Sequence, residues 1–179
     1  MTAKLEAVFL DRDGTLIENR HYLASPDGVA LLPGVREAIA AVRDRGAKLF
    51  LFTNQSGVGR GYFTLAEVEA VNRRMIDLLG LGADLFTAVC IAPERPDEPV
   101  AYRKPSPRFI QEMLAEHRIA AEAAWMVGDS PVDWQAGLAA GVRVAALVGQ
   151  AATVAEAEGL PHHPAVTPFA SLRDWARSL

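Results

Sequence analysis

Short apolar runs alternate with amphipathic stretches along this chain of 179 residues. The apolar runs are rich in Val, Leu, Ile and Phe and are as short as buried strands usually are. They predict strands at residues 7–10, 48–53, 85–91, 124–127 and 142–148. Strands that alternate with helices favour a parallel sheet with helices on both faces. We therefore predict an α/β fold, a three-layer, doubly wound, mostly parallel sheet.

Capping signals mark where helices should begin between these strands. A capping residue or a proline predicts a helix start at Pro33-Gly34, Thr64, Ser106-Pro107 and Ser130-Pro131. Thr64 has the strongest signal, because Glu67 follows it by three residues and completes a capping box. We predict helices over 107–117 and, closing the chain, over 168–178. Residues 18–32 and 92–105 lack periodicity and are predicted to be surface loops.

Composition and charge narrow the class of protein. The length fits a single domain over residues 1–179. The net charge of -4 argues against a nucleic-acid partner, and no apolar run is long enough to cross a membrane. One cysteine, Cys90, allows no internal disulfide. We expect a cytoplasmic protein that binds neither nucleic acid nor membranes, and, since heptads are absent, a monomer.

Polar residues cluster where the predicted strands end. In open α/β sheets, ligands bind at the carboxyl ends of the strands. Those ends, and the loop after the third strand, carry the segments DRDGT (11–15), TNQSG (53–57), RKP (103–105) and GDSPVD (128–133). Carboxylates, a hydroxyl, a lysine and glycines should therefore meet at one edge of the sheet.

Asp11 and Asp13 follow the first strand with one residue between them. In extended backbone their side chains point the same way, and two adjacent carboxylates need a nearby cation. Mg²⁺ prefers such oxygen ligands, and Asp129 would reach the same ion from the fourth strand. A carboxylate left free of the metal can attack phosphorus, while Gly14 lets the chain turn towards a phosphate. A simple turn explains the pair equally well. A calcium loop does not, because no Glu stands at its twelfth position.

Three further polar residues have both a functional and a structural interpretation. Thr53 can donate a hydrogen bond to a phosphoryl oxygen, but capping a turn explains it at least as well. Lys104 supplies a compact charge for phosphoryl oxygens, or it is a solvated loop lysine. Asp133 either supports the metal or, as the third residue after the Ser130 cap, interacts with the helix dipole.

Together the four segments resemble the haloacid dehalogenase superfamily of phosphohydrolases, over nearly the whole chain. The resemblance implies that Asp11 is the nucleophile. It implies that Asp13 protonates the leaving group and later deprotonates the attacking water. Thr53 and Lys104 would hold the transferred phosphoryl group. Mg²⁺ would be bound by Asp11, Asp129 and the backbone carbonyl of Asp13.

Within that superfamily, LDRDGTL, TNQSGVGRGYFT and YRKPSP are similar to the heptose-bisphosphate and histidinol-phosphate phosphatase subgroup. This likeness implies a small phosphorylated substrate, first of all a heptose bisphosphate. It also implies that there is no large cap domain, so that only loops 18–32 and 92–105 can cover the site. The expected substrate-binding residues are Asn19, Arg20, His21, Tyr22, Asn54, Gln55 and Arg103.

The chain departs from this subgroup in one loop. Many members carry a zinc site made of Cys-x-His and a later Cys-x-Cys just before Arg-Lys-Pro. Cys90 stands at the first ligand position, but Ala92, Val100 and Tyr102 replace the other three ligands. One ligand of four cannot hold structural zinc. We therefore expect no zinc, and we expect Cys90 to be a buried small hydrophobe in the third strand.

Other interpretations stay open at this point. A receiver-like phospho-acceptor module also uses an acidic pocket, a Thr and a Lys, although its acidic pair is adjacent rather than spaced by one residue. A binding protein that only keeps the fold is a further alternative. Among enzymes, a histidinol-phosphate or other sugar-phosphate phosphatase, or a phosphotransferase, fits the same segments. We interpret His162-His163 as surface loop, and Trp125, Trp134 and Trp175 as core residues.

Overall fold

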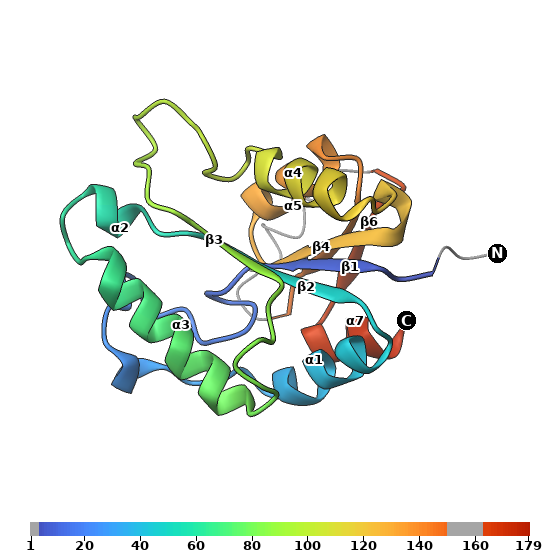
Figure 1. Ribbon diagram of the computed structural model, residues 1–179, viewed down its shortest axis with the longest axis horizontal. Coiled ribbons are helices and arrows are strands. Elements are labelled where there is room, and N and C mark those ends of the chain that lie inside the picture. The colour runs from blue at the N-terminus through green and yellow to red at the C-terminus, as the bar shows by residue number, and fades with distance from the viewer. Residues whose placement is uncertain (1–3, 150–162) are drawn as a thin grey trace.

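A six-stranded, entirely parallel sheet forms the centre of the protein (Figure 1). The computed structural model describes residues 4–149 and 163–179. The strands lie in the order β3-β2-β1-β4-β5-β6. Their bounds are β1 (Ala7–Leu10), β2 (Lys48–Asn54), β3 (Ala88–Ala92), β4 (Ala124–Gly128), β5 (Arg143–Leu147) and β6 (Val166–Phe169). The predicted three-layer, doubly wound architecture is confirmed.

Helices cover both faces of the sheet. In Figure 1, α1, α3 and α7 lie on one face, and α4 and α5 lie on the other. The α-helices are α1 (Val35–Asp44), α2 (Ser56–Gly59), α3 (Leu65–Leu79), α4 (Arg108–His117), α5 (Pro131–Ala139) and α7 (Leu172–Arg177), and 3-10 turns form η1 (Pro26–Gly28) and η2 (Ala121–Ala123). The predicted capping box is present at α3, where the Thr64 hydroxyl accepts from the Glu67 amide. None of the described helices is long and apolar enough to span a membrane.

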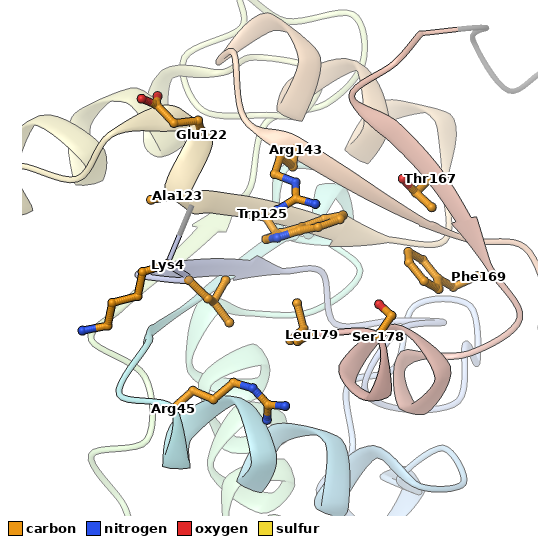
Figure 2. A pocket seen from close by; sticks show the side chains of 11 residues that line it. Lys4, Arg45, Glu122, Ala123, Trp125, Arg143, Thr167, Phe169, Ser178 and Leu179 are labelled. Carbon is orange, nitrogen blue, oxygen red and sulfur yellow. The ribbon is translucent and has the colours of Figure 1, made fainter. Parts of the chain in front are cut away.

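The two edges of the sheet differ in chemistry. The polar segments predicted from the sequence lie at the carboxyl ends of the strands. A cavity of about 630 Å³ lies at the amino ends of β1, β4 and β5. Lys4, Arg45 and Arg143 are among the residues that line it (Figure 2). There the Arg143 guanidinium lies 4.1 Å from the centre of the Trp125 ring. None of the predicted catalytic residues lines this cavity, so the volume of a cavity does not by itself locate the active site.

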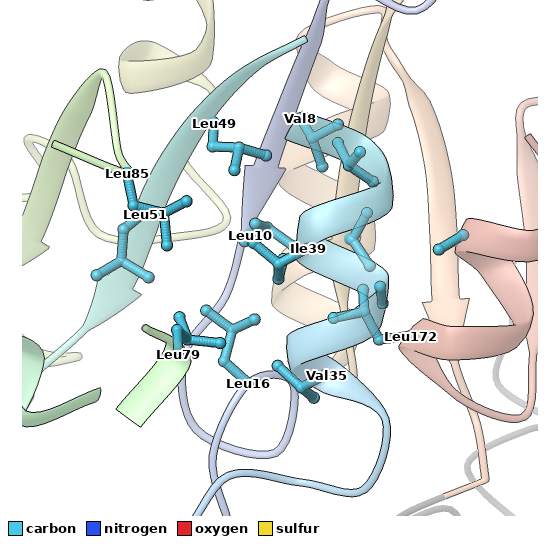
Figure 3. Packing of buried hydrophobic residues seen from close by; sticks show 14 of the residues in the cluster. Val8, Leu10, Leu16, Val35, Ile39, Leu49, Leu51, Leu79, Leu85 and Leu172 are labelled. Carbon is cyan, nitrogen blue, oxygen red and sulfur yellow. The ribbon is translucent and has the colours of Figure 1, made fainter. Parts of the chain in front are cut away.

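Successive side chains of β1 point to opposite faces of the sheet and pack in two separate hydrophobic cores. Val8 and Leu10 point to one face, where they pack with Ile39 of α1 and with residues of α3 and α7 (Figure 3). Ala7 and Phe9 point to the other face, against α4 and α5. Both pairs are fully buried, as expected for a central strand of a parallel sheet. The burial of β1 on both faces places the residue that follows it, Asp11, at a rigid point of the fold.

Aromatic residues fill the second face. Phe9 and Phe50 stack with ring centres 4.7 Å apart, and Phe109 of α4 meets Phe9 edge-on at 6.0 Å. Such offset and edge-on pairs are the favoured aromatic arrangements. The three tryptophans are buried, as the sequence predicted, and all lie in core clusters: Trp125, Trp134 and Trp175.

The closing element was predicted wrongly. Residues 168–178 do not form one helix, because Val166–Phe169 is the edge strand β6 and only Leu172–Arg177 is helical. A strand with half-exposed residues and Pro168 shows no apolar run in the sequence. Pro168 lacks an amide donor, which an edge strand tolerates. β6 exists because it pairs with β5, a contact that local sequence does not encode.

Three element starts also differ from prediction. β5 begins at Arg143 rather than residue 142. β3 begins at Ala88 rather than residue 85, although Leu85 is buried. α4 begins at Arg108 rather than Pro107, which itself occupies the N-cap. The Ser106 hydroxyl still accepts a hydrogen bond from the Arg108 amide at 3.4 Å. Such shifts of one to three residues are typical of element ends.

Replacing Ile39 by Ala should lower the free energy of unfolding by about 2–5 kcal/mol, because it opens a cavity between α1 and β1. Ile39 is fully buried. Chemical denaturation followed by circular dichroism measures the change. Arg36→Ala, on the exposed side of the same helix, serves as the control and should change the value by less than about 0.5 kcal/mol. Equal effects of both changes would contradict the assigned packing of α1.

Candidate active site

A buried lysine lies at the centre of the carboxyl edge. Lys104 is 2% exposed. Its Nζ donates to Asp11 Oδ1 and to Asp133 Oδ1, both at 2.6 Å, and to the carbonyl oxygen of Phe52 at 2.8 Å. Three segments predicted separately from the sequence, after β1, after β3 and after β4, therefore meet at one ammonium group. The alternative of a solvated loop lysine is excluded.

Three carboxylates form an acidic cluster beside this lysine. Oxygen atoms of Asp11, Asp129 and Asp133 lie within 4.8 Å of one another. Lys104 pairs with Asp11 and Asp133, whereas Asp129 makes no ion pair with any described residue. The cluster thus holds three carboxylates but only one positively charged group, Lys104. Carboxylate oxygens are the hard ligands that Mg²⁺ prefers. The residues present therefore fit a magnesium ion.

The pKa values show the same deficit of positive charge. Burial raises the pKa of Asp11 well above its ordinary value; Lys104 opposes this, and the neighbouring carboxylates add to it. Burial and then Asp133 raise the pKa of Asp129 to about 7. Burial alone would lower the pKa of Lys104, but Asp11 and Asp133 raise it above its ordinary value. Lys104 is therefore charged, and the raised pKa values of Asp11 and Asp129 mean that a further cation would stabilise their ionised forms.

Two glycines make room for the carboxylates. Gly14 has φ +86°, and a Cβ there would overlap the Asp129 carboxylate. A Cβ on Gly128 would overlap the side chain of Asp133. Two independent reasons therefore favour glycine at position 14. Its backbone conformation is one that other residues rarely adopt, and the Asp129 carboxylate occupies the space that a side chain would need.

Asp133 lies at the start of α5, as its sequence position predicted, and it also contacts the buried lysine. Its Oδ2 accepts from the Ser130 amide at 3.1 Å and from the Ser130 hydroxyl at 2.6 Å, which completes a capping box at α5. Its Oδ1 accepts from Lys104. The helix start and the buried lysine thus share one carboxylate, which couples α5 rigidly to the site.

Asp13 is held by a network that the sequence did not indicate. Its Oδ2 accepts from Arg12 Nε at 3.0 Å and from Gln55 Nε2 at 2.9 Å. The same Gln55 nitrogen lies 2.8 Å from Thr53 Oγ1. Gln55, predicted to bind substrate, therefore orients Asp13 and Thr53 towards each other.

Arg12 and Asn72 were missed as site residues. Arg12 is 1% exposed, lies between the two aspartates, and donates from Nη1 to Asn72 Oδ1 at 3.0 Å. The signal was present for Asn72, which is a polar residue on the apolar face of α3, next to Val71 and one turn from Val68. A polar side chain on such a face usually has a buried partner.

Most of the predicted substrate-binding residues border a smaller cavity of about 230 Å³ next to Asp13. This cavity is lined by Arg12, Asp13, Asn19, His21, Tyr22, Leu23, Asn54, Gln55, Ser56 and Gly57. Arg20 and Arg103 are not among the residues that line it. Arg20 instead pairs with Glu18 at 2.8 Å in an exposed position.

The loop beside the cavity is held by aromatic contacts. His21 and Tyr22 have φ values of +28° and +59°, a region that residues other than glycine rarely adopt. The Tyr22 ring meets Tyr62 edge-on with centres 4.9 Å apart. Because Tyr22 is 51% exposed, this contact leaves much of its side chain accessible above the cavity.

The side-chain amide of Asn54 makes two hydrogen bonds with the backbone of Lys104. Its Oδ1 accepts from the Lys104 amide at 2.9 Å, and its Nδ2 donates to the Lys104 carbonyl oxygen at 3.1 Å. This two-way clamp joins the end of β2 to the lysine. Asn54 therefore positions Lys104, besides bordering the cavity.

Two remaining sequence predictions concern Cys90 and the histidines. Cys90 lies in the third strand, β3, as predicted, but it is only half-buried, so the expectation of a buried residue was wrong. Burial raises the pKa of its thiol to about 12, which makes the thiol unreactive at neutral pH. His163 is exposed, and His162 lies outside the described residues.

The arrangement as a whole suits phosphoryl transfer. A carboxylate nucleophile candidate, Asp11, is held by a buried ammonium group. Asp13, a second carboxyl group that is partly exposed, borders an accessible cavity. A hydroxyl group, on Thr53, and an ammonium group, on Lys104, belong to the same edge of the sheet, and electrostatic stabilisation of such a transfer uses groups of this kind.

Known proteins resemble this chain in sequence and in structure. Residues 18–141 match the model of the haloacid dehalogenase-like hydrolases. The D-glycero-beta-D-manno-heptose-1,7-bisphosphate 7-phosphatase of Helicobacter pylori strain J99 is 36% identical over 140 residues, which are 77% of this chain and 80% of that protein. The Yersinia pestis protein with the same name is 36% identical over 83% of this chain and 82% of its own length.

A solved structure extends the likeness to the whole fold. The D,D-heptose 1,7-bisphosphate phosphatase of B. bronchiseptica, complexed with magnesium and phosphate, superimposes with a TM-score of 0.87. The two sequences are 27% identical, and the superposition covers 97% of this chain and 97% of that chain. The protein described here is therefore a phosphatase that belongs to the haloacid dehalogenase-like hydrolase family.

Proposed function

We propose that this phosphatase removes the 7-phosphate of D-glycero-D-manno-heptose 1,7-bisphosphate, with Mg²⁺ as its cofactor and through an aspartyl-phosphate on Asp11. One observation carries the chemistry: Lys104 binds Asp11 within an acidic cluster that has one cation too few. The names of the relatives support the choice of substrate. The structural neighbour complexed with magnesium and phosphate supports the choice of metal.

In the first half-reaction, a carboxylate oxygen of Asp11 forms a bond to phosphorus while the bond to the sugar oxygen breaks. The proton of Asp13 passes to that leaving oxygen. Arg12 and Gln55 hold Asp13 in place for this transfer. Thr53 donates to a phosphoryl oxygen, and the positive charge of Lys104 stabilises the negative charge that develops on the phosphoryl group.

In the second half-reaction, Asp13 takes a proton from a water molecule, whose oxygen attacks phosphorus. The bond to Asp11 breaks, and inorganic phosphate leaves. Asp13 returns to its protonated form, so that one water is consumed and no proton is gained or lost by the protein. The residues around the cavity next to Asp13 bind the sugar, with Asn19, His21 and Tyr22 at its border.

Asp11, Asp129 and the backbone carbonyl of Asp13 would hold Mg²⁺, with Asp133 and Gly14 supporting these ligands. When bound, the ion neutralises the carboxylates and polarises the phosphoryl group. Asp11 can then be ionised in spite of its burial. This explains why a nucleophile with a raised pKa is suited to its task.

Replacing Asp11 by Asn should lower phosphate release at least about a thousand-fold, because the amide cannot form the aspartyl-phosphate. Phosphate release is measured with Mg²⁺ on heptose bisphosphate, histidinol phosphate, other sugar phosphates and nucleotides. Asp44→Asn, an exposed change of the same kind, is the control and should retain full activity. Full activity of Asp11→Asn would refute the mechanism, and a strong preference for histidinol phosphate would refute the proposed substrate.

Mg²⁺ should bind more weakly as the pH falls from 8 to 6. Asp129, with a pKa of about 7 in the folded metal-free protein, must lose its proton before it can bind the ion. Each pH unit below that pKa should cost up to about ten-fold in affinity. The raised pKa also means that ionisation of Asp129 destabilises the metal-free fold as the pH rises from about 4 to 7.

Isothermal titration calorimetry in two buffers of different ionisation enthalpy measures both the affinity and the released protons. Near pH 7 the protein should release protons as it takes up Mg²⁺. Asp129→Asn should lose most of the affinity, whereas Asp44→Asn should bind as the wild type does. An affinity that stays constant between pH 6 and 8, without proton release, would exclude Asp129 as a ligand.

A further inference from the structure

The side chain of Glu94 makes hydrogen bonds across the loop that leads from β3 to Lys104. Its Oε1 accepts three backbone N–H groups, from Tyr102 at 2.7 Å, Ala101 at 3.2 Å and Arg103 at 3.4 Å. Seven to nine residues separate Glu94 from these donors. One carboxylate therefore joins the two ends of the loop, next to the residues that precede Lys104.

Glu94 also contacts the side chain of Arg103. The Arg103 Nη1 donates to the backbone carbonyl oxygen of Glu94 at 3.3 Å. Both the backbone and the guanidinium group of Arg103 are thus held by the same residue. An arginine in the loop would otherwise sample many rotamers, and ordering it in advance lowers the cost of binding a ligand.

The carboxylate that makes these contacts is charged. Burial by itself raises the pKa of Glu94, but the hydrogen bonds from the backbone amides lower it below its ordinary value. Bonds to an ionised acceptor are stronger than bonds between neutral groups. The three contacts therefore persist at neutral pH.

Lys104 does not depend on Glu94. Asn54 clamps its backbone from both sides, and Asp11, Asp133 and the Phe52 carbonyl bind its ammonium group. Loss of the Glu94 carboxylate should consequently free the backbone of residues 101–103. This loosens the segment from which Arg103 reaches the carbonyl oxygen of residue 94, and it leaves the catalytic lysine in place. The neighbouring residue, Tyr102, keeps its own bond from the hydroxyl group to Glu112 at 2.9 Å.

We propose that Glu94 is a positioning residue that sets Arg103 for the second anionic group of the substrate, and thereby determines the preference for sugar bisphosphates over simple phosphate monoesters. This inference rests on the proposed function, because Arg103, which lies outside the lining of the cavity next to Asp13, is taken to bind the part of the substrate that extends beyond that cavity and is not transferred. Arginine suits that task, since its planar group binds phosphate oxygens in pairs.

The test compares two substrates in steady-state kinetics with Mg²⁺: heptose bisphosphate, and p-nitrophenyl phosphate, which has no second anionic group. Glu94→Ala should raise the KM for the bisphosphate about ten-fold, while kcat and the kcat/KM for p-nitrophenyl phosphate change less than about two-fold. Glu94→Gln, which keeps a neutral acceptor, should raise that KM by a smaller factor. In an Arg103→Ala background, Glu94→Ala should have no further effect on KM.

Glu98→Ala is the matched control. Its carboxylate lies in the same loop and accepts a hydrogen bond from the backbone amide of Arg95 at 2.8 Å. Among the described residues, it makes no hydrogen bond with residues 101–103. It should leave both substrates unaffected. Hydrogen exchange of the amides of 101–103 should speed up in Glu94→Ala and remain slow in Glu98→Ala.

The outcomes separate this inference from the proposed function. If the wild type does not hydrolyse heptose bisphosphate, the proposed substrate fails, and the inference that depends on it fails with it. If the wild type does so and Glu94→Ala weakens both substrates equally, Glu94 has only a structural role. An unchanged KM for the bisphosphate, or additive effects with Arg103→Ala, would likewise overturn the inference.

Discussion

The buried ammonium group of Lys104 is the interaction on which the site depends. A lysine at 2% exposure is tolerated only if its charge is paired, because an isolated buried charge is costly. Asp11 and Asp133 supply that pairing, and the Phe52 carbonyl oxygen accepts a third hydrogen bond. The lysine thereby joins the segments after β1, β3 and β4. Removing either carboxylate partner would leave the buried ammonium group without one of its three hydrogen-bond acceptors.

The same network leaves the site short of one cation. Asp129 enters the cluster without an ion-pair partner among the described residues. The fold can hold such a cluster because β1 and β4 are central strands whose residues are buried on both faces. Gly14 and Gly128 provide the space that the carboxylates need. A rigid acidic pocket whose oxygen donors suit Mg²⁺ is the consequence, and the proposed aspartyl-phosphate chemistry depends on that ion.

Much of this could be predicted from the sequence because the central strands and the caps are local signals. The apolar run before Asp11, the capping box at Thr64 and the serine-proline pair at Ser130 each specify structure within a few residues. Edge strand β6 had no such signal, since it depends on pairing with β5. Arg12 and Glu94 were missed for a related reason, because their partners lie far from them in sequence or within a loop without periodicity.

The sequence by itself determined the parallel α/β fold, the acidic pair, and the set of segments that meet at one edge of the sheet. These depend on apolar periodicity and on the rule that parallel strands end together. Only the tertiary structure decided which groups touch: that Lys104 is buried, that Gln55 and Asn54 orient other site residues, and that Glu94 holds Arg103. Hydrogen bonds between side chains act over about 3 Å, and a pattern along the chain does not specify distances across the fold to that precision.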